Sequence, residues 1–365
     1  MELLKRFLEE NKKSCSVEWT NFDFSNEYKN IKALYITHDS YKVFSFIGYP
    51  ETPMPKGGYP AVVLVHGGNG YAYYEWIKKW TDKGFVAIAP DFDSNYAINM
   101  EERKVGNPCG GPKGYGSFSQ LDDKTPWTFF SVLSIIYATD VLCEQSVVNA
   151  NKISLCGLSW GGVLSLIALG IENRFRAGVI FYSSGYLLES KVFDSIATKH
   201  NLTERQRKLY ADEFDPKSFL DNISVPVLFV AGADDIVFTM SERKKTTQKI
   251  VSQKRFSYRK NFAHGHLPGR ESQEATDFVM QVLNDNLSPA IEIEKIEDKI
   301  ILNGIKNFES AQLVYTDSAF DKVREEWESL TIIGHSSVLP KNCKYYFISV
   351  IDEEGKIYSS DVYKI

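Results

Sequence analysis

The chain has 365 residues, enough to bury a large core in one or two domains. Hydrophobic residues make up 43% of the sequence and charged residues 24%, as is ordinary for a globular protein. The net charge of -5 and the lack of a basic face exclude nucleic acid as an expected partner. The basic run Arg243–Lys245 falls in a predicted helix, where we expect a solvated face.

The N-terminal segment predicts a short amphipathic helix, because charged residues interrupt the apolar run that a signal peptide needs. No stretch is long and apolar enough to span a membrane. The five cysteines have no metal-ligand spacing, and their odd number argues against a full disulfide set. We therefore expect a reduced, cytoplasmic protein that holds no metal and binds no membrane.

Between about residues 40 and 285, short apolar runs alternate with helical segments, a pattern typical of a doubly wound, mainly parallel α/β sheet. The expected strands are 61–66, 85–91, 152–159, 177–184, 225–234 and 255–261. The expected helices are 73–83, 126–145, 160–170, 241–252 and 271–287. Lys42–Tyr49 predicts an antiparallel strand at the sheet edge.

Two segments interrupt this alternation. Met100–Asp123 is rich in glycine and charge and is long for a connection, and loops of this length are often functional. Leu187–Phe219 is polar with a helical pattern, and it is inserted between two expected strands. We expect this insertion to form a lid over a substrate site. It falls within the first expected domain, a catalytic domain that spans residues 1–287.

The sequence changes character at about residue 288, after which alternating strands are joined by turn residues such as Asp352–Gly355. Residues 288–365 therefore predict a small β-sandwich-like domain. Bracing of the larger domain or formation of a homo-oligomer is the favoured role, and carbohydrate binding is the alternative.

The segment 152–162, KISLCGLSWGG, carries the strongest chemical signal. A buried strand ends at Gly157, a serine follows between glycines, and an apolar helical stretch begins at Trp160. This strand–turn–helix context gives the G-x-S-x-G motif its meaning, since the strained turn exposes the serine hydroxyl. Ser159 is the candidate nucleophile.

A serine nucleophile needs a base to accept its proton and a carboxylate to orient the base. In a doubly wound sheet these follow in the order Ser, Asp, His. Asp234 is the favoured acid, because it directly follows the strand in PVLFVAGADD, and Asp235 is the alternative. His264 is the favoured base in the loop NFAHGHLPGR, and His266 is the alternative.

Acyl transfer also needs two donors for the developing oxyanion. We assign them to the backbone N–H of Trp160, after the nucleophile, and that of Gly68, in the loop VVLVHGGNG. His66 is expected to support this loop rather than act as a base. Of the tryptophans near the site in sequence, Trp76 and Trp80 are expected in the core, whereas Trp160 is expected to touch the substrate pocket.

With these motifs in this order, residues 40–287 resemble an α/β-hydrolase of the acetyl xylan esterase, dienelactone hydrolase and prolyl oligopeptidase-like branch. The resemblance also rests on GLSWGG, FDPKSFL and AHGHLPG. It implies Ser159 as nucleophile, Asp234 as acid and His264 as base, without a cofactor. Dienelactone hydrolases proper use a cysteine where Ser159 stands, which disfavours that activity.

The expected function is hydrolysis of a small ester, such as an acetylated sugar, through an acyl-enzyme. A serine peptidase or amidase is the alternative, for which Glu101–Glu102 and Glu189 are within loops that could reach a substrate terminus. A binding protein with a vestigial triad is a third hypothesis, from a different class.

Overall fold

The computed structural model describes residues 2–11, 15–38, 41–68, 70–92, 127–199, 201–303, 307–319 and 325–365. The expected segment Met100–Asp123 therefore lies outside the described residues, as does the side chain of Trp127. In the part of the chain that is described, no helix is long and apolar enough to cross a bilayer.

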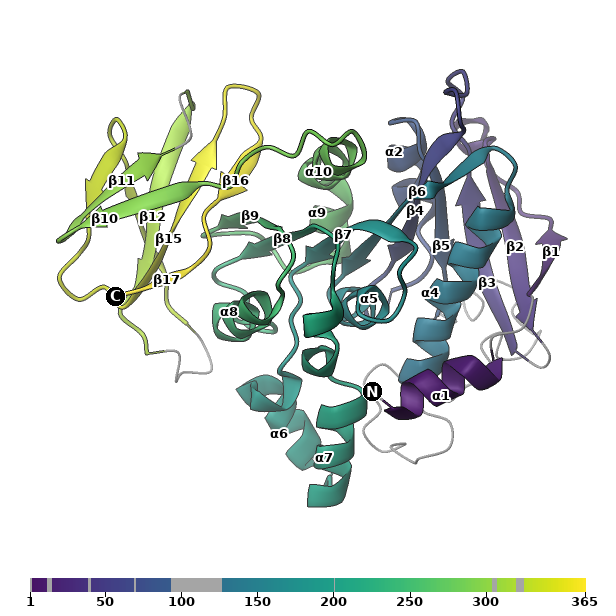
Figure 1. Ribbon diagram of the computed structural model, residues 1–365, viewed down its shortest axis with the longest axis horizontal. Coiled ribbons are helices and arrows are strands. Elements are labelled where there is room, and N and C mark those ends of the chain that lie inside the picture. The colour runs from purple at the N-terminus through teal and green to yellow at the C-terminus, as the bar shows by residue number, and fades with distance from the viewer. Residues whose placement is uncertain are drawn as a thin grey trace.

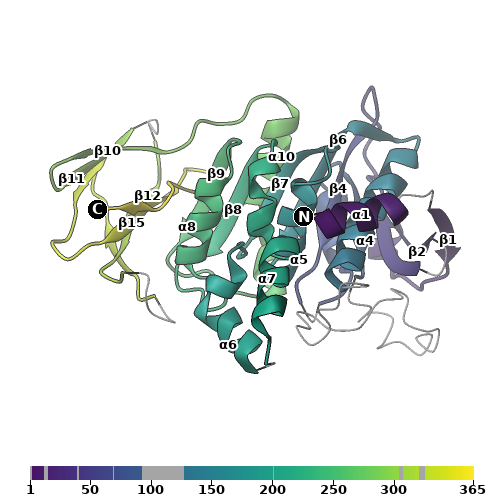
Figure 2. The ribbon, with the colours of Figure 1, turned by 60° about the horizontal axis from the view of Figure 1, so that its bottom comes forward.

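A large mixed sheet runs through the molecule and carries helices on both faces (Figures 1 and 2). Its six central strands are parallel and lie in the order β5-β4-β6-β7-β8-β9. Their bounds are β4 Tyr59–Val65, β5 Val86–Pro90, β6 Val148–Leu158, β7 Phe175–Phe181, β8 Val227–Gly232 and β9 Lys254–Arg259. Their side chains are mostly buried, which explains the continuous apolar runs of the sequence.

Helices α2 and α10 pack on one face of this sheet, and α4 and α5 pack on the other, where α8 also lies. The N-terminal α1 rests against α4. The helix bounds are α1 Glu2–Asn11, α2 Tyr74–Thr81, α4 Trp127–Glu144, α5 Trp160–Leu169, α6 Lys191–Lys199, α7 Glu204–Glu213, α8 Met240–Lys249, α9 His266–Glu271 and α10 Glu274–Leu283.

The strand expected at 42–49 is present as β3 (Tyr41–Gly48) and is antiparallel to β5, but it is not the edge. β2 (Ile31–His38) pairs with its far side, and β1 (Ser16–Thr20) pairs with β2. β1 is half-exposed and rich in polar residues, so it gives no apolar run that would mark it as a strand.

The inserted segment 187–219 is helical and contains α6 and α7, which project from the sheet in Figure 1. The side chain of Asp215 binds backbone amides at both ends of this segment. The Asp215 carboxylate accepts hydrogen bonds from the amides of Tyr186 at 2.8 Å and Leu187 at 2.7 Å at the start, and from that of Lys217 at 2.9 Å at the end. The insertion therefore leaves and re-enters the fold at one point.

The C-terminal β region, residues 288–365, contains two groups of strands. β16, β15, β12 and β13 extend the large sheet beyond β9, with β17 on the side of β15, and β10, β11 and β14 form a separate sheet. Side chains of both sheets share a second core. The bounds are β10 Glu292–Ile296, β11 Lys299–Asn303, β12 Ser310–Thr316, β13 Glu328–Thr331, β14 Ser336–Val338, β15 Tyr345–Ile351, β16 Ile357–Ser359 and β17 Tyr363–Lys364.

Candidate active site

Ser159 lies between the end of β6 and the start of α5, at a sharp turn of the backbone. Its φ of 53° and ψ of -118° are strained for a residue with a side chain. A Cβ at Gly161 would come within 2.2 Å of the carbonyl oxygens of Val65 and His66, and one at Gly157 would come within 2.4 Å of the Gly161 oxygen. Both glycines are therefore required by close packing, as the motif predicts.

The Ser159 hydroxyl contacts the imidazole of His264. Oγ lies 2.8 Å from Nε2, and the opposite ring nitrogen, Nδ1, lies 3.0 Å from Oδ2 of Asp235. We call Ser159, His264 and Asp235 the triad. The three residues follow the carboxyl ends of β6, β8 and β9, which lie at the same edge of the parallel sheet.

The choice of Asp234 as the acid is corrected by this geometry, since Asp235 is the carboxylate that contacts His264. The pairing of β8 with the following strand extends further than the sequence suggests, because the Asp234 amide still donates to the Lys260 carbonyl at 3.2 Å. The chain turns only at Asp235, whose Oδ1 accepts from the amides of Val237 at 2.9 Å and Phe238 at 3.2 Å.

Asp235 also has a partner that the sequence did not reveal. The guanidinium of Arg243 donates from Nη2 to Asp235 Oδ2 at 2.5 Å and from Nη1 to the Gly232 carbonyl at 3.0 Å. Arg243 is 1% exposed, so its expected place on a solvated face is wrong. Burial alone would raise the pKa of Asp235, but the charge of Arg243 and the hydrogen bond to His264 lower it below its ordinary value.

His264 is oriented by aromatic neighbours. The Phe238 ring is nearly parallel to it at a centroid distance of 6.0 Å, and the Tyr182 ring lies 4.7 Å away. The Tyr182 hydroxyl donates to the carbonyl of Gly265, the next residue in the loop. These contacts hold the imidazole between Ser159 and Asp235.

His266, the alternative base, contacts a different part of the site. A Cβ added to Gly67 or Gly70 would lie 2.7 or 2.8 Å from its Nε2, so this ring packs directly on the glycine loop after β4. Burial lowers the pKa of His266 to about 4, and the nearby His66 contributes in the same direction. His266 is therefore neutral at physiological pH.

The glycine loop also lies beside the nucleophile, because a Cβ on Gly67 would come within 3.1 Å of the Ser159 Cβ. The Gly67 carbonyl oxygen lies within hydrogen-bond distance of His66 Nδ1, at 2.8 Å, and accepts a hydrogen bond from the Gly70 amide at 3.0 Å. In a trans peptide the N–H points opposite to the carbonyl, so these two contacts fix the direction of the Gly68 N–H. His66 thus supports the loop, as expected.

The side chain of Trp160 does not line an open pocket, contrary to expectation. It is 1% exposed and packs 5.9 Å from the ring of Phe193 in α6, which is also 5.2 Å from Phe238. The inserted helix α6 thus contacts both the residue after Ser159 and the turn after Asp235. Trp76 and Trp80 lie in the core, at 2% and 1% exposure.

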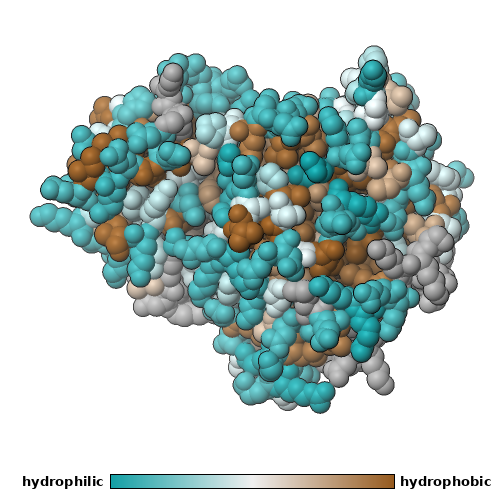
Figure 3. All heavy atoms as spheres, viewed as in Figure 1, coloured by the Kyte–Doolittle hydropathy of each residue, from teal (hydrophilic) through white to brown (hydrophobic). Residues whose placement is uncertain are grey.

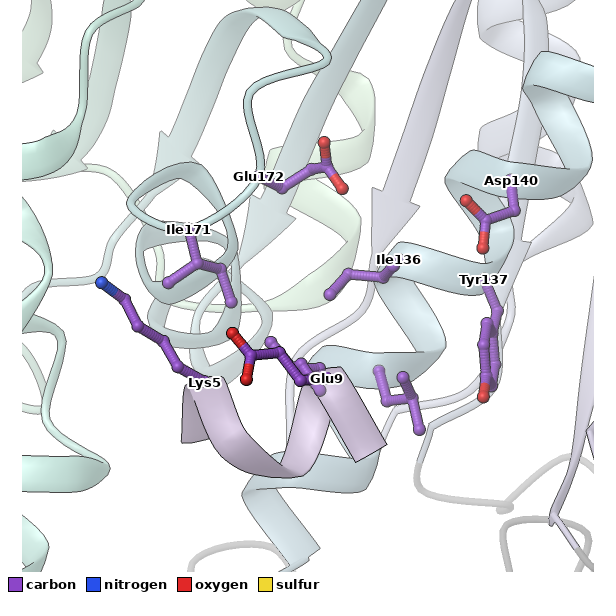
Figure 4. Close-up of a pocket in the computed structure, with 9 residues that line it drawn as sticks. Lys5, Glu9, Ile136, Tyr137, Asp140, Ile171 and Glu172 are labelled. Atoms are coloured by element: carbon purple, nitrogen blue, oxygen red, sulfur yellow. The ribbon is translucent and has the colours of Figure 1, made fainter. Parts of the chain in front are cut away.

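A cavity of about 270 Å³ lies between α1 and α4, at the opposite end of α5 from Ser159 (Figure 4). Ile136, Tyr137 and Asp140 of α4 and Glu9 of α1 are among the residues that line it. Figure 3 shows apolar side chains gathered on this face of the molecule. The length of α5 separates the cavity from the triad, and no triad residue lines it.

Within the described ranges, no three His, Cys, Asp or Glu side chains are grouped to hold a metal ion.

The model of the dienelactone hydrolase family matches residues 46–274, which include the whole triad. Two solved structures of similar fold are acetyl xylan esterases. The enzyme from Paenibacillus sp. R4 has 20% identity and a TM-score of 0.62 and covers 76% of this chain and 92% of that one.

The second is acetyl xylan esterase 1 from Thermoanaerobacterium sp. JW/SL YS485, with 19% identity, a TM-score of 0.61 and coverage of 78% of this chain and 92% of that one. A curated relative, the uncharacterized peptidase YuxL of Bacillus subtilis strain 168, is 21% identical over 212 residues. That match covers 55% of this chain and 30% of the relative, so the chain spans under a third of the relative's length. These likenesses show an α/β-hydrolase-like fold.

Proposed function

This chain belongs to the dienelactone hydrolase family, and from that premise we propose that it is a serine esterase that cleaves a small carboxylic ester through an acyl-enzyme. The observation that carries the proposal is the continuous set of contacts from Ser159 Oγ through His264 to Asp235. A serine hydroxyl on a strained turn, within hydrogen-bond distance of an imidazole nitrogen, is arranged for nucleophilic attack.

In the proposed reaction, Ser159 Oγ attacks the ester carbonyl carbon while its proton passes to His264 Nε2. The bond from carbon to the alcohol oxygen then breaks, and the leaving alcohol takes the proton from His264. Water attacks the resulting acyl-serine and gives its proton to the same nitrogen. The carboxylic acid leaves as Ser159 recovers its proton, and Asp235 balances the positive charge on the imidazolium in both steps.

The backbone amides of Gly68 and Trp160 are the proposed oxyanion donors. The fixed Gly67–Gly68 peptide beside Ser159 supports the first assignment. The place of Trp160 as the first residue of α5, directly after Ser159, supports the second, because the N-terminus of a helix favours negative charge.

The test is turnover of p-nitrophenyl esters, from acetate to octanoate, by the wild type and by Ser159→Ala. The expected result is rapid cleavage of acetate that falls by at least about 1,000-fold in the variant. Ser288→Ala, at an exposed serine, is the matched control and should keep full activity. Equal activity in Ser159→Ala and the wild type would contradict the mechanism. Acetylated sugars are the proposed natural substrate class and form the next panel.

The similarity to a protein named as a peptidase favours amide hydrolysis as the second candidate. The same triad would act on a peptide carbonyl, with the amine as leaving group. A panel of peptide p-nitroanilides, assayed beside the ester series, separates the two candidates. Higher kcat/KM on an anilide than on every ester would favour the peptidase.

A cytoplasmic location is also proposed. The described cysteines 15, 143, 156 and 343 are all free thiols, and burial raises the pKa of Cys156 well above its ordinary value. Unpaired thiols are typical of a reducing compartment. Fractionation of cells that carry a tagged full chain tests this proposal.

A further inference from the structure

The C-terminal β region places a buried carboxylate against the helix that follows the acid of the triad. Glu325 is 4% exposed. Its Oε2 accepts a hydrogen bond from the Met240 amide at 3.1 Å, and its Oε1 accepts from the Ser241 amide at 3.2 Å. The indole of Trp327 donates to the same carboxylate at 3.4 Å. The Glu325 carboxylate thus accepts hydrogen bonds both from α8 and from the C-terminal β region.

The two amides belong to the first turn of α8, where no carbonyl of the helix itself is in reach. A capping box at Thr239 and Glu242 already occupies the start of this helix. Glu325 therefore adds a second cap, supplied by a residue 85 positions away from Met240.

The position of α8 matters to the triad because the helix carries Arg243, one turn after Met240. The Arg243 guanidinium and the His264 imidazole bind the same carboxylate oxygen of Asp235. A displacement of the first turn of α8 therefore changes the position of Arg243 against Asp235, and with it the orientation of the carboxylate that His264 needs.

The same region fastens α8 and β9 at further points. Lys244 Nζ donates to the carbonyl of Val362, and the Tyr258 amide donates to Ser359 Oγ at 2.8 Å. Ser359 also pairs with Phe256, which joins β16 to β9. Because β9 leads into the loop of His264, the C-terminal β region contacts the supports of both the acid and the base.

We propose that Glu325 is a positioning residue for the triad, which fixes the first turn of α8 and thereby aligns Arg243 and Asp235 with His264. The proposal rests on the proposed function for its kinetic consequence, but the contact itself is tested without turnover. In this role the C-terminal β region acts on the triad through its contacts with α8.

The experiment compares the full-length wild type with Glu325→Gln, in which an amide group replaces one acceptor oxygen and faces a backbone donor. Glu326→Gln is the matched control, since Glu326 is the exposed neighbour. The first readout is the rate of labelling of Ser159 by a fluorophosphonate. The second is the downfield proton resonance of His264 Nδ1–H, which is assigned by its loss in His264→Ala.

Glu325→Gln is expected to slow labelling by about 10- to 100-fold and to move the His264 resonance, because small displacements of catalytic groups have large effects on rate. Glu326→Gln should change neither. A folded Glu325→Gln protein that is less stable but labels at the wild-type rate with an unmoved resonance would show a purely structural role and overturn the proposal.

Hydrogen exchange of the wild-type protein supplies a measurement that needs no variant. The Met240 and Ser241 amides should exchange as slowly as those of Val237 and Phe238, which bind Asp235. Rapid exchange at the first pair alone would overturn the proposal even if Glu325→Gln does not fold. If the wild type itself is not labelled by the fluorophosphonate, the proposed function fails. The exchange result still shows whether Glu325 binds the Met240 and Ser241 amides.

Discussion

At the scale of single residues, two aspartates that are adjacent in sequence have different environments. Asp235 is buried, accepts two backbone amides and contacts both His264 and Arg243, whereas Asp234 is partly exposed and its backbone continues the strand pairing. Sequence position alone did not decide between them, since both follow a buried strand. The contacts do.

Asp235→Asn is expected to lower kcat by about 1,000- to 10,000-fold, because an amide that donates toward Nδ1 favours the wrong imidazole tautomer. Asp234→Asn is the matched control and should retain wild-type activity within a factor of about three. Steady-state kinetics on p-nitrophenyl acetate measure both. A larger loss in the Asp234 variant would restore Asp234 as the acid.

His264 and His266, which lie in one loop, are likewise distinguished by their contacts. His264→Ala should abolish fluorophosphonate labelling, with a loss of more than about 1,000-fold, because Ser159 loses its proton acceptor. His266→Ala should cost no more than about 10-fold, since His266 supports the glycine loop and its pKa of about 4 keeps it uncharged. Equal losses in the two variants would contradict these assignments.

At the scale of elements, the sequence predicted well wherever buried runs and turn motifs coincide. The β6–α5 turn followed from KISLCGLSWGG, because the strand and helix are buried and the motif carries both glycines that close packing requires, Gly157 against Gly161 and Gly161 against the backbone at the end of β4. Arg243 and Glu325 were missed because their partners are set by tertiary packing. The residues between Glu325 and Met240 carry no pattern that relates the two.

Gly161→Ala tests the turn as an element. The added methyl would meet two backbone oxygens at 2.2 Å, so strand β4 or helix α5 must move. The expected loss of unfolding free energy is about 3 kcal/mol, measured by urea denaturation, together with loss of activity. Gly265→Ala is the control, since its φ of -178° suits any residue and the nearest atom is 3.5 Å away. A Gly161→Ala protein of wild-type stability would contradict this packing.

At the scale of the whole molecule, the buried contact of Glu325 connects stability to pH. Burial raises the pKa of Glu325 to about 7 from 4.5, and the charge of Glu242 acts in the same direction, while the Thr239 hydroxyl, the Ser241 amide and the Trp327 indole oppose it. Between these two pH values the native protein binds a proton that the unfolded chain has released. The contribution of Glu325 to stability therefore falls as pH rises through this window.

Glu325→Gln cannot ionise and lacks this dependence. The Tm of the wild type minus that of Glu325→Gln should therefore be larger at pH 5 than at pH 8, with most of the change complete by about pH 7.5. The difference between wild type and Glu326→Gln should be the same at both pH values. A wild-type advantage that grows with pH would show that the carboxyl is ionised across the whole range.

The pairing of β16 with β9 has a further consequence for biosynthesis. A chain leaves the ribosome from its N-terminus, so the six parallel strands can assemble before residues 357–359 exist. During that interval β9 is an open sheet edge, and Tyr258, whose ring packs 5.9 Å from Phe347 in the finished protein, lacks its cover. A truncated chain that ends after residue 287 would therefore lack β16 and keep β9 as an open sheet edge. Such a protein would be prone to aggregation and would be a target for chaperones and proteases.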